Sequence, residues 1–387
     1  MADRQYDIVV FGATGFTGAL TAQYLASQAD PGTRLALAGR NLTKLEALRS
    51  GLGPDQADLP LLKADVNDRN SLDELAQSTR VVISTVGPYI RYGEGLVAAC
   101  AAAGTDYVDL TGEPEFVDLM WLRYHEQAQA TGARLVHSCG FDSIPYDLGA
   151  LFTVSQLPEN LPVRLEGFVR IGGTFSGGTY HSAVGIMAHL REAAKLAGQR
   201  REREARPSGR RVRGAAGTPH HDQEAGGWVV PFPTIDPQTV LRSARALDRY
   251  GPDFTYSHYL VVKRLPVLAG LAAGAGVVAA LAQLPPTRSL LLKLKDPGDG
   301  PSPEQREKSW FRVRFRARAD GAELLTQVSG GDPGYGETSK MLGQSALCLV
   351  HDPLPETSGQ VTPAVAMGQA LIDRLVREGI RFEVLER

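Results

Sequence analysis

The sequence predicts an α/β fold in which a doubly wound parallel sheet is accompanied by an α+β lobe. Three observations predict it. Strand-like and helix-like segments alternate through the first 150 residues, a glycine-rich loop follows the first strand, and a later stretch indicates antiparallel strands. At 387 residues the chain is long enough for two domains.

The first strand is Tyr6–Phe11, a continuous apolar run rich in β-branched residues, as is typical of a strand buried on both faces. Further strand-like runs follow at residues 34–38, 61–64, 80–86, 107–110 and 134–137. Helical patterns separate them, starting near Leu20 and continuing at residues 42–49, 71–76, 95–103 and 115–131. Parallel crossovers need connections of helix length, and these segments provide them.

A glycine-rich loop joins the first strand to the first helix; its residues are Gly12, Ala13, Thr14, Gly15, Phe16, Thr17 and Gly18. The start of a helix exposes unpaired N–H groups and the positive end of the helix dipole, which together bind phosphate. Gly12 suits a tight turn, Gly15 the close approach of a pyrophosphate, and Gly18 close packing of helix on strand. The GxxGxxG spacing at this position therefore predicts nucleotide binding.

The end of the second strand indicates which nucleotide binds. An NAD site usually carries Asp or Glu about 20 residues past the glycines, bonded to the ribose 2′-hydroxyl. Residues 35–40 contain no acid; Arg40 takes that place, with Lys44 one turn into the next helix. A planar guanidinium suits a 2′-phosphate, so we predict NADP(H) as the cofactor.

Loops at the carboxyl ends of strands hold the remaining predicted contacts, because ligands of doubly wound sheets bind there. Val86 and Gly87 follow the fourth strand and would pass the ribose and the nicotinamide. Asp65 ends the third strand, where it either contacts adenine or caps the next turn.

Several stretches resemble the saccharopine dehydrogenase-like oxidoreductases, and within that group the bacterial trans-acting enoyl reductases. The matching stretches are residues 12–18 (GATGFTG), 38–40 (AGR), 85–89 (TVGPY), 91–93 (RYG), 103–113 (AGTDYVDLTGE), 139–149 (CGFDSIPYDLG), 330–335 (GGDPGY) and 362–375 (TPAVAMGQALIDRL). Tyr146 departs from the most specific stretch, CGFDSIPYDLG, where the family usually has a small residue.

The resemblance implies NADPH-dependent reduction of a C=C bond in a polyketide or fatty-acyl chain of (glyco)lipid biosynthesis. It implies a Rossmann-type domain at residues 1–150 plus 360–387, with a substrate lobe inserted at residues 151–359. For this reaction we name Tyr89 and Asp142, on position alone, as proton donors or orienting residues; Asp142 is alternatively a turn acid. The implied partners are an acyl chain or other apolar small molecule, and an acyl carrier or synthase.

Two other functions stay open. One is a saccharopine-type reaction, which makes or breaks a C–N bond between amino acids and needs arginines that converge on substrate carboxylates. The other is a catalytically idle NADP-binding protein attached to membranes or lipid stores.

Two arginine-rich stretches follow in the lobe. Residues 310–319 and 322–328 predict a β-hairpin with a turn at Asp320-Gly321. One face of its first strand is either a solvated sheet face or a dock for phosphate-bearing partners; it carries Arg312, Arg314, Arg316 and Arg318. Residues 199–227 are polar and charged, and predict a surface loop or frayed helix, or else a basic patch for an acyl carrier or anionic lipid.

Residues 265–284 form an uncharged run that as a helix would reach about 30 Å, enough to cross a bilayer core. Its many Ala and Gly residues make it only weakly apolar. Three interpretations stay open: a buried or interface helix, peripheral membrane docking, or a membrane span.

Composition and charge exclude several other classes of protein. The formal charge of -2 gives no global reason to bind nucleic acid. Cys100, Cys139 and Cys348 are too widely spaced for a disulfide framework or zinc ribbon, and His220-His221 has no acidic or Cys partner at ligand spacing, so we expect no metal site. No signal peptide precedes the first strand, so we expect a cytoplasmic protein, at the inner face of the plasma membrane if residues 265–284 dock there.

Overall fold

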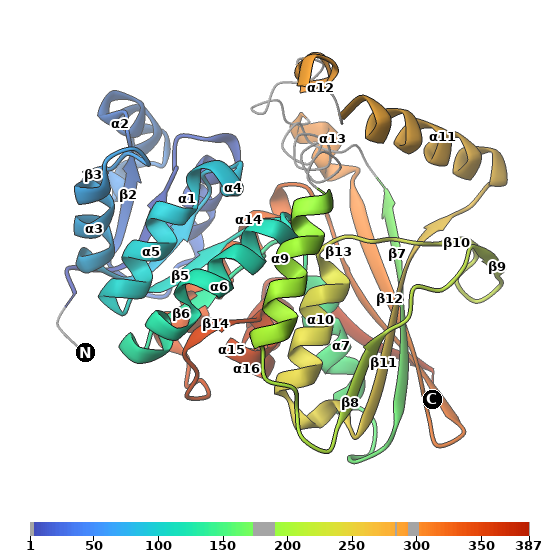
Figure 1. The fold of residues 1–387 in the computed structure, drawn as a ribbon. Coiled ribbons are helices and arrows are strands. Elements are labelled where there is room, and N and C mark those ends of the chain that lie inside the picture. The colour runs from blue at the N-terminus through green and yellow to red at the C-terminus, as the bar shows by residue number, and fades with distance from the viewer. Residues whose placement is uncertain (1–3, 173–189, 283–284, 293–301, 387) are drawn as a thin grey trace. The chain divides into compact units, whose positions relative to one another are not determined.

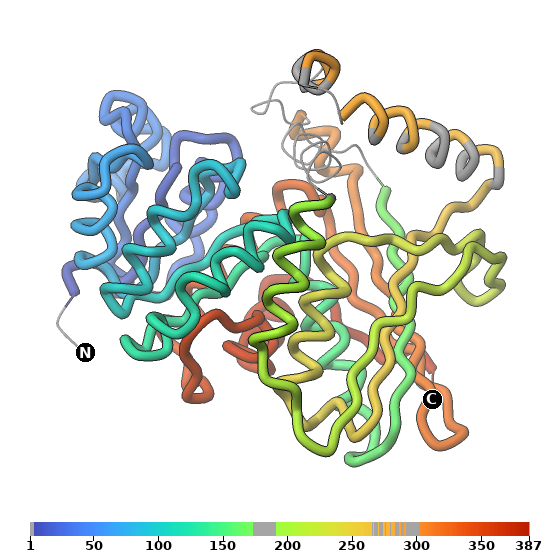
Figure 2. The backbone as a smooth tube through the Cα atoms, viewed as in Figure 1, coloured from blue at the N-terminus to red at the C-terminus, as the bar shows by residue number. Residues whose placement is uncertain are grey.

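The computed structural model describes residues 4–172, 190–282, 285–292 and 302–386, and the chain divides into two units (Figures 1 and 2). The first unit comprises Met1–Phe141 and Tyr335–Leu375, and the second comprises Asp142–Gly334 and Val376–Arg387. The chain thus returns to the first unit earlier than the predicted residue 360, and its last strand belongs to the second unit. The predicted domain boundaries are corrected accordingly.

The first unit contains a seven-stranded parallel sheet in the order β14-β6-β5-β4-β1-β2-β3. Its strands are β1 (Tyr6–Phe11), β2 (Leu35–Gly39), β3 (Leu61–Lys63), β4 (Thr79–Ser84), β5 (Asp106–Asp109), β6 (Arg134–Val136) and β14 (Gly359–Val361). The predicted doubly wound parallel sheet is confirmed. Its order reverses between β1 and β4, which creates the switch point at which such sheets bind ligands.

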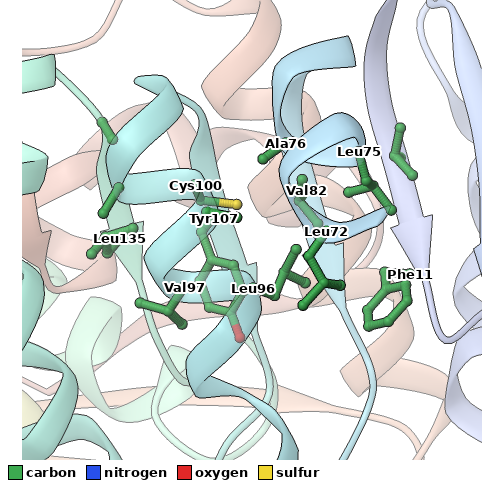
Figure 3. Close-up of a cluster of buried hydrophobic side chains, with 14 of the residues drawn as sticks. Phe11, Leu72, Leu75, Ala76, Val82, Leu96, Val97, Cys100, Tyr107 and Leu135 are labelled. Carbon is green, nitrogen blue, oxygen red and sulfur yellow. The ribbon is translucent and has the colours of Figure 1, made fainter. Parts of the chain in front are cut away.

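Helices cover both faces of this sheet. On one face α3 (Arg69–Ser78), α5 (Glu94–Ala103) and α6 (Pro114–Thr131) bury a cluster that includes Phe11 and Tyr107 (Figure 3). On the other face α1 (Phe16–Gln28) packs against α14 (Gly336–His351). The remaining helices of the unit are α2 (Leu42–Gly51), α4 (Tyr89–Tyr92), α15 (Pro363–Ala366), most of α16 (Gly368–Arg377) and the 3₁₀ turn Pro54–Gln56.

Asp7 ties β1 to the start of β2. Its carboxylate accepts hydrogen bonds from the backbone N–H of Arg34 at 2.9 Å and from the Arg34 guanidinium at 3.1 and 3.0 Å. Burial alone would raise the pKa of Asp7, but these bonds and Arg80 outweigh it and hold the pKa at about 2.

Because the folded pKa of Asp7 lies below the ordinary value of 3.8, its stabilising contribution is present above pH 4 and is lost as the pH falls toward 2. We expect Asp7→Asn to lower the free energy of unfolding by about 2 kcal/mol at pH 7. Urea unfolding at several pH values measures this, and the difference between the two proteins should shrink between pH 4 and pH 2. A difference that is constant over this range would contradict the assignment.

The second unit contains a mixed sheet in the order β15-β13-β12-β7-β11-β10-β9, with β8 also paired to β11. Its strands are β7 (Val163–Gly172), β8 (Arg211–Gly214), β9 (His220–Asp222), β10 (Gly227–Pro231), β11 (Asp253–Val262), β12 (Trp310–Ala319), β13 (Ala322–Gly330) and β15 (Arg381–Glu386). Strands β12 and β13 form the predicted hairpin around Asp320-Gly321, with Ala319 paired to Ala322. Residues 199–227, predicted as a loop or frayed helix, instead contain the end of a helix and the short strands β8 and β9, whose mostly exposed side chains gave no apolar alternation.

Among the described residues, the helices α7 (Ile144–Ser155) and α10 (Asp236–Ala246) pack on one face of this sheet. A Cβ on Gly149 of α7 would lie 2.4 Å from the ring of Phe315. The opposite face carries the arginines of β12. Part of this face is buried in a small apolar cluster, which consists of Phe168, Ala225, Val229, Tyr259 and Val261. The unit also contains α9 (Leu190–Arg203), the 3₁₀ turn Asp248–Tyr250 and α13 (Pro303–Glu307).

The uncharged run forms α11 (Leu265–Ala282), and α12 (Pro285–Leu292) follows; residues 283–284 lie outside the described residues. The side chains of Val277 and Leu281 are 59% and 38% exposed, which disagrees with a helix buried in the core. In the described part of the chain, no helix has the length and apolar character needed to cross a membrane.

Candidate functional site

The glycine loop brings β1, α1 and the loop after β4 into close contact. Gly12 has a φ of +85°, and a Cβ there would lie 2.6 Å from Val86 Cγ2 and 2.8 Å from Thr85 Oγ1. A Cβ on Gly18 would lie 2.2 Å from the Gly12 carbonyl oxygen. Both positions therefore require glycine on geometric grounds.

The space in front of α1 suits a phosphate. Gly15 is the N-cap of α1, no side chain caps the helix, and the nearest atom to a Cβ on Gly15 would be the Gly12 carbonyl oxygen at 3.4 Å. The loop buries Ala13 and leaves Thr14 and Gly15 exposed. The uncapped first turn, which begins at Phe16 and includes Thr17, offers N–H groups and the helix dipole to an anion. These residues fit the pyrophosphate of a dinucleotide.

The loop after β4 lies beside the glycine loop at the switch point. Thr85 Oγ1 donates to the carbonyl oxygens of Phe11 and Gly12, each at 3.1 Å, and so fixes the two loops together. Val86 is half-buried and Gly87 is exposed, which leaves this loop open to the ribose and nicotinamide. Sequence reasoning placed Thr85 in this loop but gave its side chain no role.

Tyr89 takes a structural role, which corrects its prediction as a proton donor. It is buried, and its hydroxyl donates to the carbonyl oxygen of Ser84 at 2.9 Å. Burial, followed by the charge of Asp109, raises its pKa well above 10. The backbone N–H groups of Tyr89 and Ile90 donate to the Glu113 carboxylate at 3.0 and 2.9 Å. Sequence reasoning missed this role of Glu113, for which the TGE stretch after β5 was the only signal.

Two exposed cations stand at the carboxyl end of β2. Arg40 and Lys44 are exposed, and in the described part of the chain neither side chain makes an ion pair or hydrogen bond. Asn41 caps α2 by accepting the backbone N–H of Lys44 at 3.0 Å. Two residues after β3, the carboxylate of Asp65 accepts the backbone and side-chain N–H groups of Asn67 at 2.9 and 3.2 Å, as a turn acid does. The adenine contact of Asp65 stays a prediction.

Replacing Arg40 with alanine should weaken NADPH binding by about 1–3 kcal/mol, because a charge-assisted hydrogen bond to the 2′-phosphate is lost. NADH affinity should stay nearly unchanged, since NADH has no 2′-phosphate. Fluorescence titration with both nucleotides measures this. Equal loss for the two nucleotides would show that Arg40 does not read the 2′-phosphate.

An acidic pair lies at the start of the second unit. Asp142 is exposed, and among the described residues its carboxylate accepts no hydrogen bond, so the turn-acid alternative is not observed. The surrounding protein atoms nevertheless remove water from the Asp142 carboxyl, and this desolvation raises its pKa to about 6. Asp236 is buried and accepts hydrogen bonds from Ser143, at 3.4 Å, and from Thr234. Burial and then the charge of Asp142 raise the pKa of Asp236 well above 3.8.

A buried histidine adjoins this pair. His258 Nε2 lies 3.7 Å from the nearer Asp236 carboxylate oxygen, and Nδ1 lies 2.9 Å from the Tyr256 hydroxyl. Burial lowers the pKa of His258 to about 3, which keeps the ring neutral. Tyr146 packs edge-on against it, with 5.1 Å between ring centroids. Sequence reasoning missed Asp236 and His258, which lie far along the chain and carry no motif.

Comparisons with known proteins agree with this geometry. Residues 8–136, which include the glycine loop, match the family model of the saccharopine dehydrogenase NADP-binding domain. The chain is 38% identical to a trans-acting enoyl reductase of Mycobacterium ulcerans and 37% identical to one of Mycobacterium tuberculosis; each alignment covers 98% of this chain and 97% of the relative.

The fold is also similar to a solved structure. Apo saccharopine dehydrogenase (L-Glu forming) from Saccharomyces cerevisiae matches with a TM-score of 0.57 at 13% identity, over 98% of this chain and 100% of that one. At that identity the likeness shows the fold alone. From the full-length relatives and the matched domain together, the chain belongs to the trans-acting enoyl reductases, with a saccharopine dehydrogenase-type NADP-binding domain, and is an NADP(H)-dependent oxidoreductase.

Proposed function

We propose that the protein reduces the C=C bond of an enoyl thioester in a fatty-acyl or polyketide chain for (glyco)lipid biosynthesis, in trans to the synthase that makes the chain. The observation that carries the proposal is the full-length similarity to proteins named for this reaction. The glycine cradle and the exposed Arg40 would hold NADPH, which supplies a hydride when bound.

Reduction also requires a proton at the α-carbon, and we assign its delivery to Asp142. Asp142 is an exposed residue, its carboxyl accepts no hydrogen bond from the residues that the structure describes, and its pKa is raised to about 6. The pKa of the buried Asp236 is raised as well, by burial and then by the charge of Asp142, so the two interacting carboxyls release their protons in two steps. Along the chain, Asp142 follows the loop at the carboxyl end of β6, the edge of the sheet at which doubly wound folds bind their ligands.

The saccharopine-type alternative has less support from the second unit. It needs arginines that are free to meet substrate carboxylates; Arg316 pairs with Glu166 and Asp222 and Arg318 with Glu323, whereas Arg312 has no carboxylate partner among the described residues. These arginines project from the face of the sheet opposite to α7 and α10.

NADPH consumption with enoyl thioesters of increasing chain length, compared with saccharopine, separates the functions. We expect turnover with the enoyl thioesters alone. Turnover of saccharopine alone would overturn the proposal, and turnover of neither would support an idle NADP-binding protein.

We further propose that α11 contacts the inner face of the plasma membrane, where an apolar chain could enter without crossing water. The exposed Val277 and Leu281 carry this proposal. The double variant Val277→Glu/Leu281→Glu should lose most of its flotation with anionic liposomes. The matched control is Val376→Glu, at an exposed apolar position on α16, and it should float like the wild type. A wild-type protein that never floats contradicts the proposal.

A further inference from the structure

Arginines gather in one row across the face of the second sheet opposite to α7 and α10. Strands β15, β13, β12 and β7 are successive neighbours in this sheet, and Figure 1 labels the last three of them. Their register places Arg170 opposite Arg312, Arg312 opposite Ser329, and Ser329 opposite Arg381. These four residues are named the arginine row. Neighbouring strands lie about 4.8 Å apart, so the row spans about 14 Å.

A tryptophan holds two of these arginines in place. Trp310 is 37% exposed, and its ring packs over Gly172, where a Cβ would lie 2.2 Å from the indole nitrogen. The guanidinium carbons of Arg170 and Arg312 lie 5.9 and 5.6 Å from the Trp310 ring centroid. Both guanidinium groups therefore have a cation–π contact that limits their motion.

The row has unmatched charge and unmatched polar atoms. Within the described residues no carboxylate pairs with Arg170, Arg312 or Arg381, although like charges directly opposite across two strands destabilise a sheet. Ser329 is only 4% exposed, and its hydroxyl has no partner among the described residues. The buried Nε of Arg312 has none either. Burial, followed by the charges of Arg312 and Arg170, lowers the pKa of the adjacent Arg314.

The other end of the same face is neutralised. Arg316 stands opposite Glu166 and pairs with it at 3.0 Å, and also with Asp222 and Glu224, each at 2.8 Å. Arg318 pairs with Glu166 at 3.3 Å. The arginine row thus lacks the glutamate that stands opposite an arginine at the other end of this face, although such a pair would stabilise the sheet here as well. Arg170 opposite Arg312 destabilises the sheet, and one acidic residue at either position would remove this cost. We infer that both arginines are present because they bind an anionic ligand.

We propose that the arginine row binds the phosphate of an acidic carrier protein that presents its acyl chain on a phosphate-linked arm. Guanidinium groups and a hydroxyl form a donor set suited to a phosphate, and a row about 14 Å long can also meet acidic side chains around it. One half-exposed tryptophan offers too little apolar surface for insertion into a bilayer, which favours a protein partner. The inference rests on the proposed function, in which another protein delivers the substrate.

The variant Arg170→Glu tests the proposal because it repeats at this row the Glu166–Arg316 pairing of the other end. It should raise Tm by about 1–3 °C, through a favourable cross-strand pair. It should also weaken binding of a purified acyl carrier protein in its phosphopantetheinylated form at least tenfold. The matched control is Arg164→Glu, on the same strand and face beside Glu166 and Arg318, and its affinity should equal that of the wild type.

Isothermal titration calorimetry on protein saturated with NADP⁺, which blocks the nucleotide phosphate site, measures these affinities. Phosphopantetheinylated carrier should bind more tightly than unmodified carrier, and its affinity should fall as salt rises. Equal affinity of Arg170→Glu and wild type, equal binding of both carrier forms, or no binding to the wild type would each overturn the proposal. Loss of binding to anionic vesicles instead of carrier would assign the row to a membrane and overturn it as well.

The calorimetry needs no turnover, so it separates this inference from the proposed function. If the protein binds the carrier through the arginine row but reduces no enoyl thioester, the proposed function is wrong and the carrier-binding inference still holds. A protein that reduces a free enoyl thioester but shows no effect of Arg170→Glu refutes the row and leaves the function.

Discussion

Replacing Asp142 with asparagine should lower kcat for enoyl reduction by about 10²–10⁴-fold, the usual contribution of a positioned general acid. Asparagine keeps the shape of the side chain but has no proton to give at neutral pH. NADPH affinity should not change, because the glycine loop and Arg40 lie in the first unit. Steady-state kinetics with an enoyl thioester, together with an NADPH titration, measure both quantities.

The pH dependence of the reaction provides a second test of Asp142. An acid acts only when it is protonated, so with a pKa of about 6 the wild-type kcat/KM should fall about tenfold per pH unit above that value. Asp142→Asn should lack this limb. The control is Asp320→Asn, at an exposed turn position with a φ of +49° that asparagine tolerates, and it should keep the wild-type profile. Full activity of Asp142→Asn would remove Asp142 from the mechanism.

Replacing Gly18 with alanine should weaken NADPH binding by about 10–100-fold, as expected when one or two charge-assisted hydrogen bonds are lost. The added Cβ would lie 2.2 Å from the Gly12 carbonyl oxygen and 2.7 Å from Thr85 Oγ1. Because the Gly12 carbonyl belongs to the backbone, it cannot rotate away as a side chain can, so α1 must shift. The N–H groups at the start of α1 then no longer point toward the phosphate. We expect Tm to fall as well, because the shift disturbs packing of α1.

Two other glycine variants separate fold from ligand effects. Gly15→Ala meets only the Gly12 carbonyl oxygen, at 3.4 Å, so Tm should stay near the wild-type value while NADPH affinity falls if the pyrophosphate lies over Gly15. Gly51→Ala, at the end of α2 with open space around it, should change neither quantity. Unchanged NADPH affinity in Gly18→Ala would contradict the proposed phosphate site.

The strands of the first unit could be predicted because buried parallel strands are continuous apolar runs that carry their signal locally. Helix α14 was missed because it is buried nearly all round, with Thr338, Ser339 and Gln344 among its buried residues, so no apolar stripe marks it. Strand β14 was missed because its three residues are too few to show a strand pattern.

The candidate site likewise has residues that a local motif identifies and residues that only the fold brings together. The glycine loop and Arg40 are local motifs, and sequence alone located them. Asp236 comes close to Asp142, and His258 to Asp236, only through the topology of the second sheet and α10. The arginine face of β12 was also visible in the sequence, but which arginines are neutralised depends on register with β7, which places Glu166 opposite Arg316 and Arg170 opposite Arg312.

The most direct test of enoyl reduction is isotope transfer from NADPH that carries deuterium at C4 of the nicotinamide. With an enoyl thioester as substrate, mass spectrometry should find a saturated product with one deuterium at the β-carbon. In D₂O with unlabelled NADPH, the deuterium should instead appear at the α-carbon. An enoyl thioester recovered unsaturated, while saccharopine is turned over, would contradict the account.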